Sequence, residues 1–293
     1  MLWKEQYRLL KQVLLQQYEE GEASAIARLV VEHTGKADMR AIEASIVTTE
    51  QTEQINRYLK ELLTHRPVQY VLNEAWFYNL KFEVNESVLI PRPETEELVE
   101  LIIKDVRSMK YEVRNTSSSY IVPPASLLDI GTGSGCIPIT IQKNIPEAEV
   151  TAVDVCSEAL HVAMTNAVNH ETSINFQLLD FLDESKWQEL GMFDIIISNP
   201  PYIKTGESKS MSEHVLQYEP HKALFVPDDD ALIFYRKIAA FATTHLKPGG
   251  KVYVEINQQL GKETAAVFTE KGFTNVELLK DMSGNERFVV CSL

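Results

Sequence analysis

The feature that most constrains the fold of this 293-residue chain is an alternation of apolar and amphipathic segments from residue 126 onward. Short aliphatic runs predict strands, and the longer stretches between them predict helices. We expect strands at 126–130, 149–155, 174–179, 193–198 and 251–256, and helices at 136–143, 157–169, 229–246 and 261–271. Strands that are almost wholly apolar and alternate with helices are typical of a parallel sheet covered on both faces. The pattern therefore predicts an α/β, Rossmann-like fold.

The C-terminal end departs from this alternation. Residues 273–280 and 286–292 read as two strands, and the short segment 282–285 between them reads as a turn. A hairpin at the end of a parallel sheet requires one antiparallel strand. We therefore expect the last strand to run against its neighbours.

The first 65 residues have a pattern typical of a small helical module. Apolar side chains recur at helical spacing, and Thr48 with Gln51 could form a capping box at the start of one helix. This region holds no glycine-rich loop and no cluster of catalytic residue types. The sequence predicts a module that packs against something or recognises it.

The pattern changes again after this module. Aromatic and β-branched residues over 75–90 predict a pair of strands, and the polar stretch 107–125 reads as an exposed connection. We expect three parts: a helical domain over 1–73, a β-hairpin connection over 74–90, and an α/β domain over 91–293.

Composition excludes several classes of protein. A net charge of −14, from 28 Lys+Arg against 42 Asp+Glu, opposes sequence-independent binding to DNA or RNA, which requires cationic side chains. No apolar run approaches the ~20 residues of a membrane span, and the charged, amphipathic N-terminus does not read as a secretory signal. Cys136, Cys156 and Cys291 lie far apart, which favours a reducing cytoplasm and argues against disulfides or structural zinc. We expect no metal.

A glycine-rich loop follows the predicted strand at 126–130. It comprises Gly131, Thr132, Gly133, Ser134 and Gly135. Glycines permit a sharp turn and close approach to a ligand, and the helix behind them offers free N–H groups. A dinucleotide fingerprint would place glycine at position 136, where this chain has cysteine. The loop predicts a nucleotide-type ligand, and a tight turn without a ligand is the alternative.

Acidic residues end the next two predicted strands. Asp154 can accept hydrogen bonds from both hydroxyls of a ribose, or it can cap the helix that follows. Asp180 and Phe181 could bracket an adenine, one by hydrogen bonding and the other by stacking, although an aspartate at a strand end is usually a turn residue. A ribose-binding residue alone does not distinguish between NAD and S-adenosylmethionine as the ligand.

The fourth motif, Asn199-Pro200-Pro201-Tyr202, ends the strand at 193–198. Ligands of open α/β sheets bind at the carboxyl ends of the strands. Proline restricts its own φ and the residue before it, so the Asn199 side chain and the Pro200 carbonyl are held rigidly. Two fixed acceptors match the two N–H bonds of a planar –NH2 group, and Tyr202 offers a flat wall. We predict Asn199, Pro200 and Tyr202 as the catalytic residues, acting by orientation and electrostatics.

The glycine loop followed by Asn-Pro-Pro-Tyr resembles the amino-group methyltransferases that use S-adenosylmethionine, and most closely the peptide chain release factor glutamine N5-methyltransferases. The resemblance covers nearly the whole chain, and the combination of motifs is specific. The matching segments are 90–96, 129–135, 199–202, 219–225, 255–256 and 280–287. We find no role for Glu219 or Arg287 beyond a salt bridge or a surface position.

The resemblance implies a seven-stranded class I methyltransferase sheet behind a helical N-terminal domain that helps to recognise the substrate. It implies that the glycine loop, Asp154, Asp180, Phe181 and Asn199 contact S-adenosylmethionine. Residues 199–202 would hold the glutamine of the Gly-Gly-Gln loop of class 1 release factors. We further expect a monomer in the cytoplasm that binds neither nucleic acid nor membrane.

Three rival functions remain open. An N6-adenine methyltransferase acting on DNA or RNA would use the same tetrapeptide, but it must extract a base from its stack and bind phosphates. A cofactor-binding protein without catalysis would not need an intact Asn199–Tyr202. An NAD dehydrogenase is disfavoured by the glycine spacing.

Overall fold

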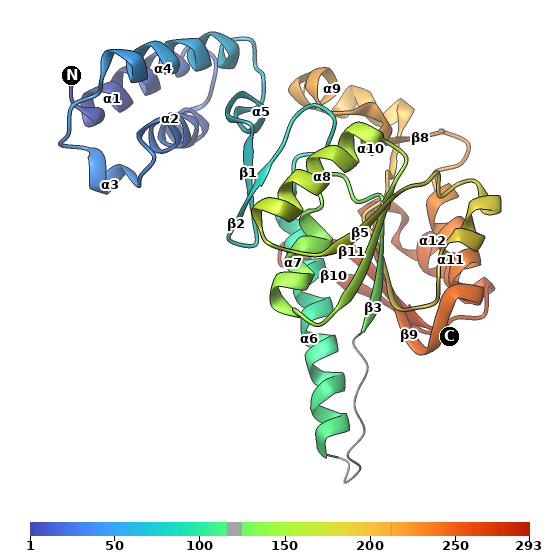
Figure 1. The fold of residues 1–293 in the computed structure, drawn as a ribbon. Coiled ribbons are helices and arrows are strands. Elements are labelled where there is room, and N and C mark those ends of the chain that lie inside the picture. Colours follow the sequence, from blue (N-terminus) through green and yellow to red (C-terminus); the bar gives the residue numbers. More distant parts are fainter. Residues whose placement is uncertain (116–124, 212) are drawn as a thin grey trace. The chain divides into compact units, whose positions relative to one another are not determined.

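The computed structural model describes residues 1–115, 125–211 and 213–293, and these form two compact units (Figure 1). The first unit comprises Met1–Glu74 with Ser212–Tyr218, and the second comprises Ala75–Met211 with Glu219–Leu293. The boundary near residue 74 lies close to the predicted one. The short segment ending at Tyr218, which belongs to the first unit, was not anticipated. The three-part division and the role of each part stay predictions.

The first unit is a helical bundle. Its helices are α1 (Trp3–Leu14), α2 (Glu20–Gly35), α3 (Met39–Ile42), α4 (Thr49–Leu62), α5 (Val68–Leu72) and α9 (Glu213–Tyr218). The predicted capping box is confirmed, because Thr48 Oγ1 accepts from Gln51 N and the Gln51 side chain accepts from Thr48 N. The Tyr218 hydroxyl donates to the Thr64 carbonyl at 3.0 Å, so α9 is tied to the chain just beyond α4.

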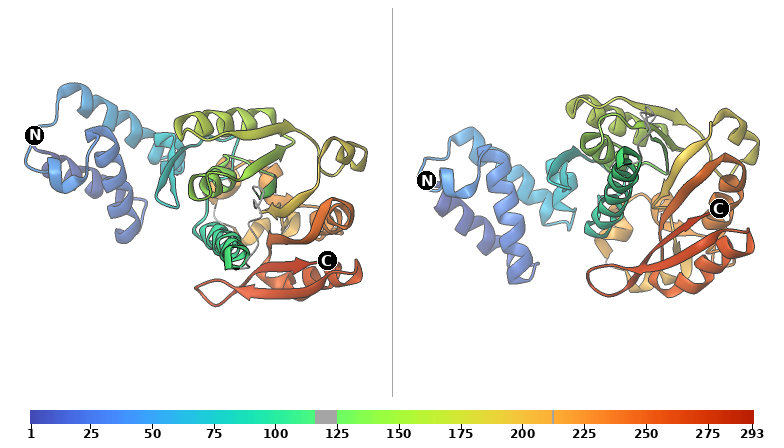
Figure 2. Two further views of the ribbon diagram at one scale, coloured as in Figure 1. Left: turned by 60° about the horizontal axis from the view of Figure 1, so that its bottom comes forward. Right: turned by 90° about the horizontal axis from the view of Figure 1, so that it is seen from below.

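A seven-stranded sheet forms the centre of the second unit, in the order β10-β11-β9-β6-β3-β4-β5. Its strands are β3 (Ser126–Ile130), β4 (Glu149–Asp154), β5 (Ile174–Leu178), β6 (Phe193–Ser198), β9 (Leu246–Glu255), β10 (Thr274–Lys280) and β11 (Glu286–Ser292). β11 is antiparallel to both β10 and β9, and these last strands lie along one edge of the sheet (Figure 2, red). The other neighbouring pairs are parallel, which confirms the predicted fold class.

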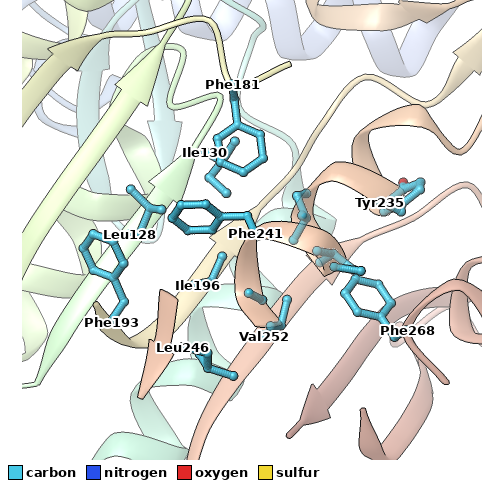
Figure 3. Close-up of a cluster of buried hydrophobic side chains, with 14 of the residues drawn as sticks. Leu128, Ile130, Phe181, Phe193, Ile196, Tyr235, Phe241, Leu246, Val252 and Phe268 are labelled. Atoms are coloured by element: carbon cyan, nitrogen blue, oxygen red, sulfur yellow. The ribbon is translucent and has the colours of Figure 1, made fainter. Parts of the chain in front are cut away.

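Alternate residues of the sheet pack into two separate cores. Leu128, Ile130 and Ile196 face a cluster built with α11 (Ile233–His245) and α12 (Gly261–Glu270). Leu127 and Ile195 face the other cluster, built with α6 (Pro93–Asn115) and α7 (Cys136–Asn144). Figure 3 shows the first cluster with Phe241 at its centre. Burial on both faces explains why these strands read as continuous apolar runs.

The remaining elements of the second unit are short or lie outside the sheet. They are α8 (Ser157–Asn169), α10 (His221–Leu224), the hairpin β1 (Glu74–Phe77) and β2 (Leu80–Glu83), the pair β7 (Ile203–Lys204) and β8 (Phe225–Val226), and the 3-10 turns Glu184–Glu189, Thr205–Ser210 and Gln258–Leu260. The expected hairpin is present, although its second strand ends at Glu83.

One expectation is corrected within the described residues. Residues 107–115 belong to α6, whereas we expected an exposed connection over 107–125. This stretch contains Arg, Met, Lys and Glu, which are good helix formers, and no glycine or proline interrupts it. The rest of that stretch, 116–124, lies outside the described residues. Pro93 is the first residue of α6, where a missing N–H is tolerated.

No helix among the described residues is long and apolar enough to cross a membrane.

Candidate active site

The glycine loop lies at the carboxyl end of β3, between that strand and α7. Gly133 and Gly135 have φ values of +54° and +78°, a region that favours glycine. A Cβ added at Gly131 or Gly133 would meet no described heavy atom within 4 Å, whereas at Gly135 it would lie 3.1 Å from the Ala163 Cβ of α8. Gly135 is therefore required by packing, and the other two glycines leave open space beside their backbone.

Asp154 ends β4 and contacts this loop directly. Its Oδ2 accepts from Gly133 N at 2.9 Å, and its Oδ1 accepts from Cys156 N at 2.9 Å. The second bond closes the turn that leads into α8. The N-cap of α8 is Cys156 and the helix has no side-chain cap, so Asp154 does not cap it. Burial raises the pKa of Asp154, and the backbone donors of Gly133 and Cys156 oppose that shift. A carboxylate has about four acceptor sites, so both bonds leave capacity for ligand hydroxyls.

A second carboxylate, Asp129, lies under the same loop and was not among the predicted site residues. It is fully buried on β3, and neither of its oxygens has a hydrogen-bond partner among the described residues; nor has the Thr132 hydroxyl. Burial raises the pKa of Asp129 to about 7, the neighbouring Thr132 hydroxyl opposes that shift, and the charge of Asp154 adds to it. An unpaired buried carboxylate is costly, so Asp129 is stabilised by a donor or a cation beside it, either the Thr132 hydroxyl or a group of a ligand.

Asp180 and Phe181 follow β5, but their environments differ. Asp180 is exposed and accepts from Leu182 N, which is a turn role. Phe181 is buried, with its ring centroid 5.6 Å from Trp187 and 5.3 Å from Phe241 (Figure 3). Both lie at the carboxyl edge of the sheet, and their contact with an adenine stays a prediction.

Asn199 is the first residue after β6, and its side chain is held by a chain of hydrogen bonds. Asn199 Nδ2 donates to Thr95 Oγ1 at 3.0 Å, and Thr95 Oγ1 donates to Glu255 Oε2 at 2.7 Å. Thr95 lies in the first turn of α6 and Glu255 ends β9, so three elements meet here. Burial raises the pKa of Glu255 to about 7, with Thr95 and Arg287 opposing the shift.

Tyr202, the last residue of the tetrapeptide, reaches the same carboxylate. Its hydroxyl donates to Glu255 Oε1 at 3.3 Å, and its carbonyl accepts from Asn257 Nδ2 at 3.3 Å. Burial, followed by the charge of Glu255, raises the pKa of Tyr202 above its usual range. The Tyr202 hydroxyl therefore stays neutral and donates a hydrogen bond to Glu255.

Two ion pairs surround this network. Arg92 Nη2 lies 2.6 and 2.8 Å from the two carboxylate oxygens of the buried Glu219, and Arg287 Nε lies 3.1 Å from Asp281 Oδ2. The salt-bridge interpretation of Glu219 and Arg287 is confirmed. The positive charges of both arginines lower the pKa of Tyr202 and oppose the effect of its burial.

The structure therefore joins residues that are scattered along the chain. Thr95 and Glu255 lie in the motif segments 90–96 and 255–256, but the sequence alone assigns neither residue a role. Their partners lie 104 and 160 residues away, so no local signal marks them. Asp129 had a recognisable signal, an acidic residue inside an otherwise apolar buried strand.

Comparison with known proteins decides the family. Residues 120–224 match the model of the methyltransferase small domain. The chain is 48% identical to the release factor glutamine methyltransferase of Flavobacterium psychrophilum, over 82% of this chain and 80% of that protein. It is 35% identical to the release factor glutamine methyltransferase of Bacteroides thetaiotaomicron, over 97% of each chain. The chain belongs to the release factor glutamine methyltransferase family. The resemblance drawn from the motifs is confirmed.

The fold comparison agrees with this family. The 16S rRNA methyltransferase RsmC of T. thermophilus has a TM-score of 0.51 with this methyltransferase, at 18% identity, over 75% of this chain and 49% of that one. At this level of identity the likeness shows the fold alone.

S-adenosylmethionine is the methyl donor that membership of this family implies, and the site fits it. The open space at Gly131 and Gly133 leaves room for a ligand against the loop. The unpartnered Asp129 carboxylate suits a group that is cationic or donates hydrogen bonds, and S-adenosylmethionine carries both an ammonium and a sulfonium.

Proposed function

We propose that this methyltransferase transfers a methyl group from S-adenosylmethionine to the N5 amide nitrogen of glutamine in the Gly-Gly-Gln loop of class 1 release factors. The names of its relatives supply the substrate class. The observation that supports this reaction is the fixed orientation of the Asn199 side chain. Because its NH2 group is committed to Thr95, its oxygen is left to accept a hydrogen bond.

The glycine loop, Asp129 and Asp154 would hold the cofactor, with Asp154 on the ribose and Phe181 near the adenine. Asn199, Pro200, Pro201 and Tyr202 would hold the substrate amide. The Asn199 oxygen and the Pro200 carbonyl accept its two N–H bonds and hold the plane of the –NH2 group. The Tyr202 ring closes one side.

Bound S-adenosylmethionine supplies a methyl group on a positively charged sulfur, which departs with the electrons of its bond to carbon. The amide nitrogen is a weak nucleophile because its lone pair is delocalised into the carbonyl. Two hydrogen bonds orient that lone pair and favour its pyramidal form, and the nitrogen forms its bond to the methyl carbon. The extra proton then leaves to water, so the chain's contribution is orientation and electrostatics.

A labelled transfer assay tests this function. The enzyme is offered tritiated S-adenosylmethionine with a purified release factor, with the same factor carrying alanine for the loop glutamine, and with unmethylated DNA and RNA. We expect label on the first substrate alone, at the glutamine identified by mass spectrometry. Label on adenine would replace the substrate with a nucleic acid, and equal label on the alanine variant would exclude the loop glutamine.

A further inference from the structure

We infer that Glu255 and Thr95 are positioning residues that fix which end of the Asn199 carboxamide meets the substrate. The inference rests on the proposed role of Asn199 and adds the groups that make this role possible. An asparagine side chain can rotate by about 180° and exchange its oxygen and nitrogen at little steric cost. An acceptor site for a –NH2 group therefore needs something that forbids the exchange.

Glu255 sets the donor-to-acceptor direction of the hydrogen bonds that link it through Thr95 to Asn199. This side chain is 1% exposed, at the end of β9 in the sheet interior. When ionised, a carboxylate only accepts hydrogen bonds. The hydroxyl hydrogen of Thr95, 2.7 Å away, must therefore point toward Glu255.

Thr95 in turn determines which group of Asn199 can bond to it. A hydroxyl has one hydrogen, and once that hydrogen is committed to Glu255 its oxygen can only accept. Thr95 is 3% exposed, so water does not readily replace either partner. The group facing Thr95 Oγ1 must therefore be a donor, and in this structure it is Asn199 Nδ2 at 3.0 Å.

Asn199 thus has only one satisfactory orientation. Turning the carboxamide over would set its oxygen against the Thr95 oxygen, with no hydrogen between them, and would leave buried acceptors unpaired. In the observed orientation the carboxamide oxygen remains available for a substrate N–H.

The other carboxylate oxygen holds the far end of the same motif. Glu255 Oε1 accepts from the Tyr202 hydroxyl at 3.3 Å, and the Glu255 carbonyl accepts from Tyr235 at 3.0 Å, which anchors its own backbone. One carboxylate therefore fixes both ends of Asn-Pro-Pro-Tyr. A glutamine at this position could accept with its single oxygen from only one of the two donors.

The test compares Thr95→Val, Thr95→Ser and Glu255→Gln with Thr264→Val as a matched control. Thr264 is a fully buried threonine of α12 whose hydroxyl has no partner among the described residues. The measurements are kcat and KM on the substrate that the wild-type enzyme labels, the Kd for S-adenosylmethionine by calorimetry, and thermal stability. Both release factor and unmethylated DNA are offered to the wild type.

We expect Thr95→Val and Glu255→Gln to lower kcat about tenfold or more, while cofactor Kd changes less than about threefold. Thr95→Ser restores the hydroxyl and should recover most of the rate, and Thr264→Val should leave it unchanged. A rate of Thr95→Val within about twofold of wild type, or a Thr95→Ser rate no better than that of Thr95→Val, would overturn the inference. If the wild-type enzyme labels DNA and not the release factor, the proposed function is refuted. The positioning roles of Thr95 and Glu255 would then be tested with the same variants on the amino group of the DNA base.

Discussion

At the residue scale, two carboxylates are buried near the carboxyl ends of strands β3 and β9. Asp129 and Glu255 are both fully buried, and burial raises the pKa of each to about 7. Asp129 has no hydrogen-bond partner among the described residues, whereas Glu255 has two. The first is suited to a ligand, and the second is suited to holding other side chains.

The environment of Glu255 includes charges from several elements. Glu94 of α6 raises its pKa, whereas Arg287 of β11 and the hydrogen bonds from Thr95 and Tyr202 lower it; burial is the largest effect. Because the folded pKa lies above the ordinary value, ionisation of Glu255 costs stability as the pH rises toward 7. Activity has the opposite dependence, since the ionised form fixes the direction of the Thr95 hydrogen bond.

We predict that kcat falls as the pH is lowered through about 7, where Glu255 takes up its proton. A protonated Glu255 can donate to Thr95, which allows the Asn199 carboxamide to reverse. The Glu255→Gln variant should show a flatter pH profile of kcat. Asp129 titrates in the same range, so a profile unchanged by Glu255→Gln would assign the inflection to Asp129 and contradict the prediction.

Asp154→Ala should weaken cofactor binding about tenfold or more, because a charge-assisted hydrogen bond contributes roughly 1.5–3 kcal/mol. Calorimetric titration with S-adenosylmethionine measures the change. Glu158→Ala is the control, since Glu158 is an exposed carboxylate at the start of the adjacent helix α8. Equal affinities for the two variants would remove Asp154 from the cofactor site.

At the element scale, the glycine loop depends on how closely α7 and α8 approach each other. Gly135→Ala would put a methyl group 3.1 Å from the Ala163 Cβ at a φ of +78°. We expect a loss of about 1–3 kcal/mol in the free energy of unfolding, measured with urea. Gly21→Ala in α2 is the control, since its Cβ meets nothing within 4 Å. An equal stability of the two variants would show that the contact relaxes without cost.

The elements themselves were largely predictable. Strands such as Phe193–Ser198 are buried on both faces, so their apolar runs mark them directly. The helical continuation of α6 to Asn115 was missed because the Ser- and Pro-containing sequence after it led us to interpret 107–125 as one connection. Val106, Met109 and Val113 in fact keep helical spacing. In the site, two residues were predictable because local sequence motifs mark them. Asp154 ends the strand after the glycine loop, and Asn199 precedes a pair of prolines. Thr95 and Glu255 have no such signal, because tertiary contact alone brings them to Asn199.

At the scale of the whole molecule, the two compact units suggest that catalysis and substrate recognition belong to different units. The sheet unit carries every predicted site residue, and the helical unit of Met1–Glu74 with α9 carries none. We propose that the helical unit recognises the release factor. Its α9 follows the Asn-Pro-Pro-Tyr motif in the sequence, so the chain enters the helical unit soon after that motif.

Removal of residues 1–74 should leave the Kd for S-adenosylmethionine within about twofold of wild type. Methylation of an intact release factor should fall much further than methylation of a short Gly-Gly-Gln peptide, because only the intact factor can use the helical unit. The ratio of kcat/KM on the two substrates measures this effect. A ratio equal to that of the complete chain would show that the helical unit has no part in recognition.

The most direct test of the central claim is a pair of measurements on Asn199→Ala: the single-turnover rate of methyl transfer to a release factor, and the Kd for S-adenosylmethionine. The account predicts that the rate falls about 100-fold or more while the Kd changes less than about threefold, because Asn199 orients the amide in the transition state. Equal losses in rate and in cofactor affinity would contradict it, since Asn199 would then serve the cofactor rather than the amide.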